Sequence, residues 1–190
     1  MVATQPVMRV AAVLGVVLLF PPPIWGVKSQ QALAVVLADG TVYFALPPSL
    51  VTATTTFKSP NVPATYYFTL SLPENAGEPL QRVTFTQYKG KEDIQFDLKS
   101  TNAKAETSSD SRQRLTLEDV TRDRKTKTVS VTFNPPVSPG KTVVIGLRSV
   151  SNPLYGGVYL FGVTAFPAGE KSHGQFLGYG RLQFSSPSFF

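Results

Sequence analysis

Short apolar segments separated by proline- and glycine-rich turns run through most of the chain, and this spacing constrains the fold more than any other feature. Within Thr65–Leu72, Leu80–Tyr88 and Val129–Asn134, apolar residues recur at every second position. That period is typical of a β-strand with one buried face. Asn134-Pro135-Pro136 interrupts the last of these ladders, because proline lacks the N–H that a central strand donates.

The strand pattern predicts an all-β protein. The segments number about eight to ten at spacings of roughly 8–15 residues, and no window shows the period of an amphipathic helix. A parallel sheet would need crossover helices between its strands. We therefore expect a single-domain antiparallel β-sandwich, with an immunoglobulin-like strand order as one form of it. The chain has no cysteine, so burial must stabilise the fold, and its 13 Phe and 7 Tyr residues can supply that burial.

The first 34 residues differ from the rest and predict export. Arg9 precedes an apolar run, Val10–Phe20, that would span only about 16 Å as a helix, roughly half of a bilayer core. The small-residue triplet Ala32-Leu33-Ala34 is typical of a signal-peptide cleavage site. We expect residues 1–34 to be a signal peptide and 35–190 an exported domain, periplasmic or extracellular. The alternative is an uncleaved membrane anchor, which would bring the domain into contact with the membrane.

The inventory of reactive side chains argues against most catalytic and metal chemistry. Both methionines, Met1 and Met8, lie in the signal segment, and His173 is the only histidine. Copper and zinc sites need several His, Met or Cys ligands. His173 lies in a polar turn, where we expect an exposed side chain. The sequence assigns no catalytic, cofactor-binding or metal residue and no cofactor, and a net charge of +6 is too small to indicate nucleic-acid binding.

Two acids leave one enzymatic alternative open. Glu74 and Glu78 lie in the loop Pro73–Pro79, and a pair of carboxylates is enough for glycosidase-type hydrolysis. A carboxylate-only hydrolase acting on envelope glycans is therefore the alternative to a protein without enzymatic activity. Acids in a loop are more often solvated, and we favour the non-enzymatic interpretation.

Other charged and polar segments have simpler explanations. Neither the acids Glu92, Asp93 and Asp97 nor the pair Asp119 and Asp123 follows the alternating acidic pattern of a calcium loop, so weak calcium binding stays open and solvation is favoured. Two further segments are expected to lie outside the strands. The polar stretch Thr101–Arg112 predicts a loop, and the basic stretch Thr121–Thr128 predicts a solvated hairpin tip.

Several blocks of the chain together resemble a known family. They are Thr65–Leu80 (TYYFTLSLPENAGEPL), Phe133–Gly140 (FNPPVSPG), Asn152-Pro153, Gly156–Val163 (GGVYLFGV), Phe166–Gly169 (FPAG) and Gln175–Leu182 (QFLGYGRL). This set is similar to a cyanobacterial exported-protein family catalogued as domain of unknown function, number 2808, over roughly Phe44 to Phe184. The resemblance implies an exported or periplasmic protein without an assigned activity, and it carries over no catalytic residue.

The remaining candidate for function is a turn. Asn152, Tyr155, Gly156 and Gly157 lie in a segment punctuated by proline and glycine, where an aromatic side chain gains no strand pairing. Tyrosines in such positions often dominate binding interfaces. Tyr155 could also fold back and cover the end of the sandwich. The sequence thus favours a non-enzymatic binding or structural module whose partner is an unidentified protein or envelope component.

The export interpretation has a direct test. We expect the mature protein to begin at Val35, because cleavage after Ala34 would remove the whole apolar segment. Mass spectrometry of the protein isolated from its host measures this. An intact Met1–Ala34 segment would instead indicate a membrane anchor.

Overall fold

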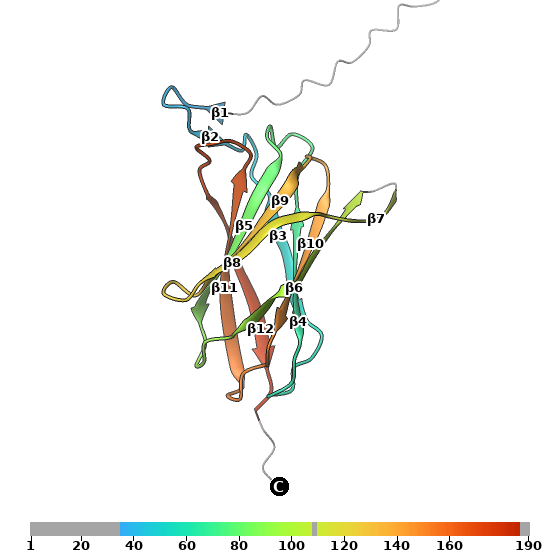
Figure 1. The fold of residues 1–190 in the computed structure, drawn as a ribbon, viewed down its shortest axis with the longest axis vertical. Helices are drawn as coiled ribbons and strands as arrows, with labels where there is room; N and C mark the ends of the chain where they lie inside the picture. Colours follow the sequence, from blue (N-terminus) through green and yellow to red (C-terminus); the bar gives the residue numbers. More distant parts are fainter. Residues whose placement is uncertain (1–34, 108–109, 187–190) are drawn as a thin grey trace, which may run out of the picture. The chain divides into compact units, whose positions relative to one another are not determined.

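The computed structural model describes residues 35–107 and 110–186, which form two antiparallel β-sheets packed face to face (Figure 1). The predicted signal segment, residues 1–34, lies outside the described residues. No helix in the described part of the chain is long and apolar enough to cross a membrane. The strands are β1 (Val35–Val36), β2 (Val42–Tyr43), β3 (Ser49–Thr55), β4 (Thr65–Ser71), β5 (Leu80–Lys89), β6 (Phe96–Thr107), β7 (Asp110–Arg114), β8 (Leu117–Asp123), β9 (Thr128–Val137), β10 (Thr142–Ser149), β11 (Gly157–Pro167) and β12 (Gln175–Phe184).

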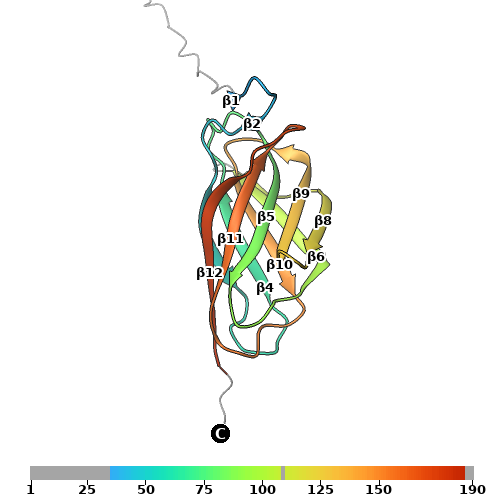
Figure 2. The ribbon, with the colours of Figure 1, turned by 90° about the vertical axis from the view of Figure 1, so that its left-hand side faces the viewer.

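The sheet order confirms the predicted sandwich. One sheet has the order β3-β4-β10-β6-β7 and the other β12-β11-β5-β9-β8, while β1 and β2 form a separate hairpin. In Figure 2 the second sheet faces the viewer, with the first behind it. The run β3-β4-β10-β6 has the order A-B-E-D of an immunoglobulin sheet, and β5-β11-β12 has the order C-F-G. Strands β7, β8 and β9 are inserted between the equivalents of D and E.

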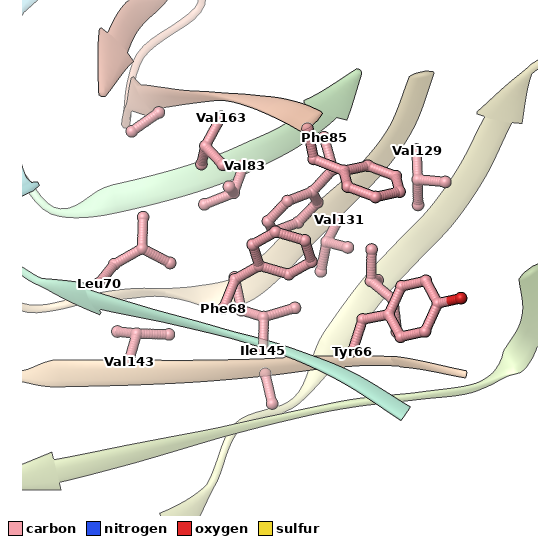
Figure 3. Close-up of a cluster of buried hydrophobic side chains, with 14 of the residues drawn as sticks. Tyr66, Phe68, Leu70, Val83, Phe85, Val129, Val131, Val143, Ile145 and Val163 are labelled. Carbon is pink, nitrogen blue, oxygen red and sulfur yellow. The ribbon is translucent and has the colours of Figure 1, made fainter. Parts of the chain in front are cut away.

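The core consists of the inward faces that the two-residue period predicts. Tyr66, Phe68 and Leu70 of β4 are fully buried, and so are Val83 and Phe85 of β5 in the opposite sheet. Figure 3 shows these side chains pointing into the space between the sheets. The rings of Phe68 and Phe85 meet there with their centroids 4.5 Å apart. The alternation therefore identified the buried face of both strands correctly.

The expected loop at Thr101–Arg112 is wrong. Strand β6 continues through Thr107, and β7 follows from Asp110 to Arg114. Thr101, Ala103 and Ala105 alternate inward on β6 and are buried. The segment lacked a visible apolar period because its inward residues are small. Pairing with the central strand β10 makes it a strand, since β10 would otherwise leave one edge of buried N–H and C=O groups without partners.

Proline changes the pairing of β9 without ending the strand. Residues Thr128–Thr132 pair with β5 in regular register, and the next partner pair after Thr132 is Val137 with Leu80. The ladder is therefore interrupted at the Asn134-Pro135-Pro136 segment, as predicted, while the strand itself extends to Val137. The chain then crosses to the other sheet, where β10 lies between β4 and β6.

Two phenylalanines of neighbouring strands test the assigned faces. Phe161 of β11 is 1% exposed and Phe176 of β12 is 58% exposed. We expect Phe161→Ala to lower the free energy of unfolding by about 3–5 kcal/mol, because it leaves a cavity between the sheets. Phe176→Ala is the matched control and should change it by less than about 1 kcal/mol. Urea unfolding followed by tyrosine fluorescence measures both, and equal losses would contradict the assigned faces.

Candidate functional site

A buried asparagine joins two loops at the lower end of the sandwich in Figure 1. The Asn152 side-chain amide donates to the carbonyl oxygens of Phe57 (3.0 Å) and Ser59 (2.9 Å), which lie in the loop between β3 and β4. Its side-chain oxygen accepts a hydrogen bond from the Tyr66 hydroxyl at 2.8 Å. Its backbone N–H donates to the carbonyl of Val62. The side chain therefore connects both loops to the core strand β4.

Tyr66 carries this network into the core. Its ring is fully buried, and burial raises the pKa of its hydroxyl well above the ordinary value of a tyrosine. The hydroxyl therefore stays protonated and can donate to Asn152. Asn152 is itself only 2% exposed, so it cannot present its side chain to a partner. The sequence proposed Asn152 as part of an interaction surface. In the structure its side chain instead supports the two loops from inside the protein.

Tyr155 has a fixed backbone and an exposed ring. Its N–H donates to a carboxylate oxygen of Glu92 at 2.6 Å, and its carbonyl accepts from the hydroxyl of Tyr159 at 3.0 Å. The ring is 56% exposed, with the Lys91 ammonium nitrogen 5.8 Å from its centroid. Tyr155 therefore does not cover the core, whereas Tyr159 and Phe161 of β11 are buried in it.

The two glycines of the turn are required by close packing and by the backbone conformation. A Cβ on Gly156 would lie 2.5 Å from the backbone nitrogen of Ser186, so a side chain there would push the segment after β12 away. Gly157 has φ = 133°, a conformation that residues with side chains rarely adopt. Both residues shape the turn that carries Tyr155.

The joined loops carry several exposed apolar side chains. The loop between β3 and β4 contributes Phe57, and the segment between β10 and β11 contributes Val150, Leu154 and Tyr155. We call these four residues the loop end. Single exposed apolar residues are common on protein surfaces. These four lie on two loops that one buried side chain connects.

The other sequence candidates lie elsewhere. Glu74 is exposed and its side chain packs beside Gly140, while Glu78 is half-buried. His173 is exposed, as expected, and its ring stacks on Tyr43 with centroids 4.5 Å apart. Glu74 lines a surface hollow together with Glu106, and Glu78 is not among the residues that line it.

Four of the five acids that could have suggested calcium have protein donors as partners, among them Glu92, which accepts from the N–H of Tyr155. Asp93 forms an ion pair with Arg122 at 2.8 Å. Asp97 accepts a hydrogen bond from the Ser100 hydroxyl at 2.6 Å, which lowers the pKa of this carboxyl. The backbone N–H of Lys125 bonds Asp123 and likewise lowers the pKa of that carboxyl. Among residues 35–107 and 110–186, no three His, Cys, Asp or Glu side chains are grouped to hold a metal ion.

A second feature was missed by the sequence analysis. Tyr88, Phe176 and Tyr179 form a row of exposed rings on the outer face of the sheet β12-β11-β5-β9-β8. Tyr88 occupies an outward position next to inward-facing Phe85 and Gln87, a placement that the alternation of β5 could have indicated. Phe176 and Tyr179 are three residues apart, and strict alternation would put them on opposite faces.

The fold and these surfaces define an immunoglobulin-like β-sandwich with exposed aromatic groups. More specifically, residues 41–184 match the family described as "Protein of unknown function (DUF2808)", and the chain belongs to this family. A search of curated proteins finds no match.

Solved structures of bacterial surface proteins show weak similarity. The backbone protein of the group B streptococcus pilus 2b is 11% identical with a TM-score of 0.45, and the match covers 70% of this chain and 56% of that one. A collagen-binding domain from a Staphylococcus aureus adhesin is 10% identical with a TM-score of 0.41, and the match covers 70% of this chain and 93% of that one. The chain thus spans little more than half of the pilus protein. The fold assignment rests on the strand order of this protein's own sheets.

The link between Tyr66 and Asn152 can be measured by a double-mutant cycle. Asn152→Ala should cost about 2–3 kcal/mol of unfolding free energy, because it leaves buried polar groups without partners. Tyr66→Phe should cost less in the Asn152→Ala background than in the wild type, by at least about 0.5 kcal/mol. Tyr88→Phe, which removes an exposed hydroxyl, should be additive with Asn152→Ala. Additivity of the Tyr66 and Asn152 changes would contradict the proposed connection.

Proposed function

We propose that the protein is an exported, non-enzymatic binding module of the cell envelope that contacts a protein partner through the loop end. The observation that carries this proposal is Tyr155: its ring is more than half exposed while both of its backbone polar groups are bonded within the domain. A tyrosine presented in this way offers a large apolar ring and a hydroxyl to a partner.

The support under the loops favours binding over a merely exposed surface. Side chains and loops lose conformational entropy when they are ordered in a complex, and that loss weakens affinity. Here Asn152 and Glu92 already hold the backbone of the loop, so the ordering that remains is mainly that of exposed side chains such as Tyr155. Tyrosine is also enriched among the few residues that dominate interface energies.

Export is the second part of the proposal. The support for it is the sequence of residues 1–34, where Arg9, the short apolar run Val10–Phe20 and the triplet Ala32-Leu33-Ala34 follow the order of a signal peptide. Retention of the segment as an anchor would place the same module at the membrane surface.

Substitution of Tyr155 tests the loop end. Tyr155→Ala should change the free energy of unfolding by less than about 0.5 kcal/mol, because it retains both backbone hydrogen bonds. It should abolish recovery of a partner from the host's envelope fraction, measured by affinity purification with quantitative mass spectrometry. Val51→Ala, at an equally exposed position on the edge strand β3, is the control and should retain the partner. A steep loss of melting temperature, with partner recovery falling only in proportion, would show that Tyr155 is structural.

A further inference from the structure

Three exposed rings form a continuous row on the sheet β12-β11-β5-β9-β8. This is the sheet whose strands face the viewer in Figure 2. The centroids of Tyr88 and Tyr179 are 5.3 Å apart, and those of Tyr179 and Phe176 are 5.1 Å apart. Their exposed fractions are 72% for Tyr88, 48% for Tyr179 and 58% for Phe176. We call these three residues the aromatic strip. It lies on the strands β5 and β12, which flank β11.

The backbone is shaped to bring the rings together. Gly178 has φ = 120° and lies at a register shift: Val163 pairs with Gly178 and Thr164 pairs with Phe176, so Leu177 is an extra residue in β12. Such a bulge changes which face the following side chains point to, and it brings Phe176 and Tyr179 to the same face. On β11 between them, a Cβ at Gly162 would lie 3.3 Å from the Phe176 ring and 3.6 Å from the Tyr179 ring. The rings of Phe176 and Tyr179 thus pack directly over Gly162, which has no side chain.

The charged residues on the strands that carry the strip, and on the strand between them, all have one sign. Strands β5, β11 and β12 contain Arg82, Lys89 and Arg181 and no acidic residue. The neighbouring strand β9 carries no charge, and the acids of this sheet are confined to its far edge strand β8. The guanidinium of Arg82 lies 4.1 Å from the centroid of the Phe166 ring, and both residues belong to the same sheet. The surface is therefore aromatic and cationic, and it is complementary to an anionic partner.

We infer that the aromatic strip is a second binding surface, distinct from the loop end, for a protein partner that presents carboxylates beside apolar side chains. Aromatic residues and arginine are enriched at protein interfaces, and arginine bonds carboxylates in a fixed geometry. The rings are inclined to each other by 44° and 69°. They do not form the flat platform on which successive sugar rings would stack, and this favours a protein over an acidic polysaccharide.

The test compares three immobilised anionic polymers as probes for the purified protein: a random copolymer of glutamate and tyrosine, polyglutamate, and heparin. Biolayer interferometry at physiological salt measures the binding. We expect the copolymer to bind most tightly, because it supplies both carboxylates and rings. Tyr179→Ala and Arg181→Glu should each weaken copolymer binding by about tenfold or more. Tyr88→Ser is a second variant at the most exposed ring and should weaken it in the same direction.

Two matched controls separate this surface from the rest of the protein. Arg114→Glu makes the same charge change at an exposed position on β7, the edge strand of the opposite sheet, and Tyr155→Ala removes an exposed ring from the loop end. Both should leave copolymer binding within about twofold of the wild type, since surface charges far from a site are screened. The reverse also holds: the aromatic-strip variants should retain the envelope partner of the loop end, so either proposal can fail alone.

Three results would overturn the inference. Equal affinity for polyglutamate and the copolymer would show that the rings contribute nothing. Tighter binding of heparin, lost in Tyr179→Ala, would identify an acidic polysaccharide as the ligand class. Equal losses in Arg181→Glu and Arg114→Glu would show that only the net charge of the protein matters. Thermal unfolding of each variant confirms that it is folded, as expected for exposed positions.

Discussion

Burial of side chains between the two sheets is the constraint on which the rest of this structure depends. The chain has no cysteine, so no disulfide joins one sheet to the other. Aromatic rings from both sheets meet instead, as Tyr66 of β4 does with Phe161 of β11 at a centroid distance of 6.1 Å. The two sheets stay packed against each other only while these rings fill the space between them. A cavity there would lose both the free energy of hydrophobic burial and the packing contacts.

Tyr66 connects that core to the surface. Its ring belongs to the buried cluster and its hydroxyl bonds Asn152, whose side chain in turn holds the loop between β3 and β4. The loop that presents Tyr155 therefore depends on a hydrogen bond within the protein interior, where water cannot replace a lost partner. In this arrangement the loop is fixed while the ring stays exposed. That combination favours binding, because less conformational entropy is lost when a complex forms.

The loop end and the aromatic strip use different physical means to present aromatic groups. The loop end relies on side-chain hydrogen bonds that fix irregular backbone, whereas the aromatic strip relies on a bulge at Gly178 and on the missing side chain of Gly162. Their charges differ too: both Glu92 and Lys91 lie at Tyr155 of the loop end, while the charged residues on the strands of the aromatic strip are all cations. The two surfaces therefore differ in chemistry as well as in the way they present their rings.

The sequence by itself determined the fold class, the inward faces of strands such as β4 and β5, and the turn that carries Tyr155, because a two-residue period and proline–glycine turns are local properties of the chain. It left open whether Tyr155 is exposed, and it did not reveal the later part of β6, since Ala103 and Ala105 are too small to show a period and become strand residues through pairing with β10. Nor did it show that Asn152 points inward: its partners Phe57 and Ser59 lie more than ninety residues earlier. The aromatic strip likewise arises only when β12 bulges beside β11 and Tyr88 arrives from β5. Local patterns decide which residues are buried, whereas contacts between residues distant in sequence decide which exposed residues lie together.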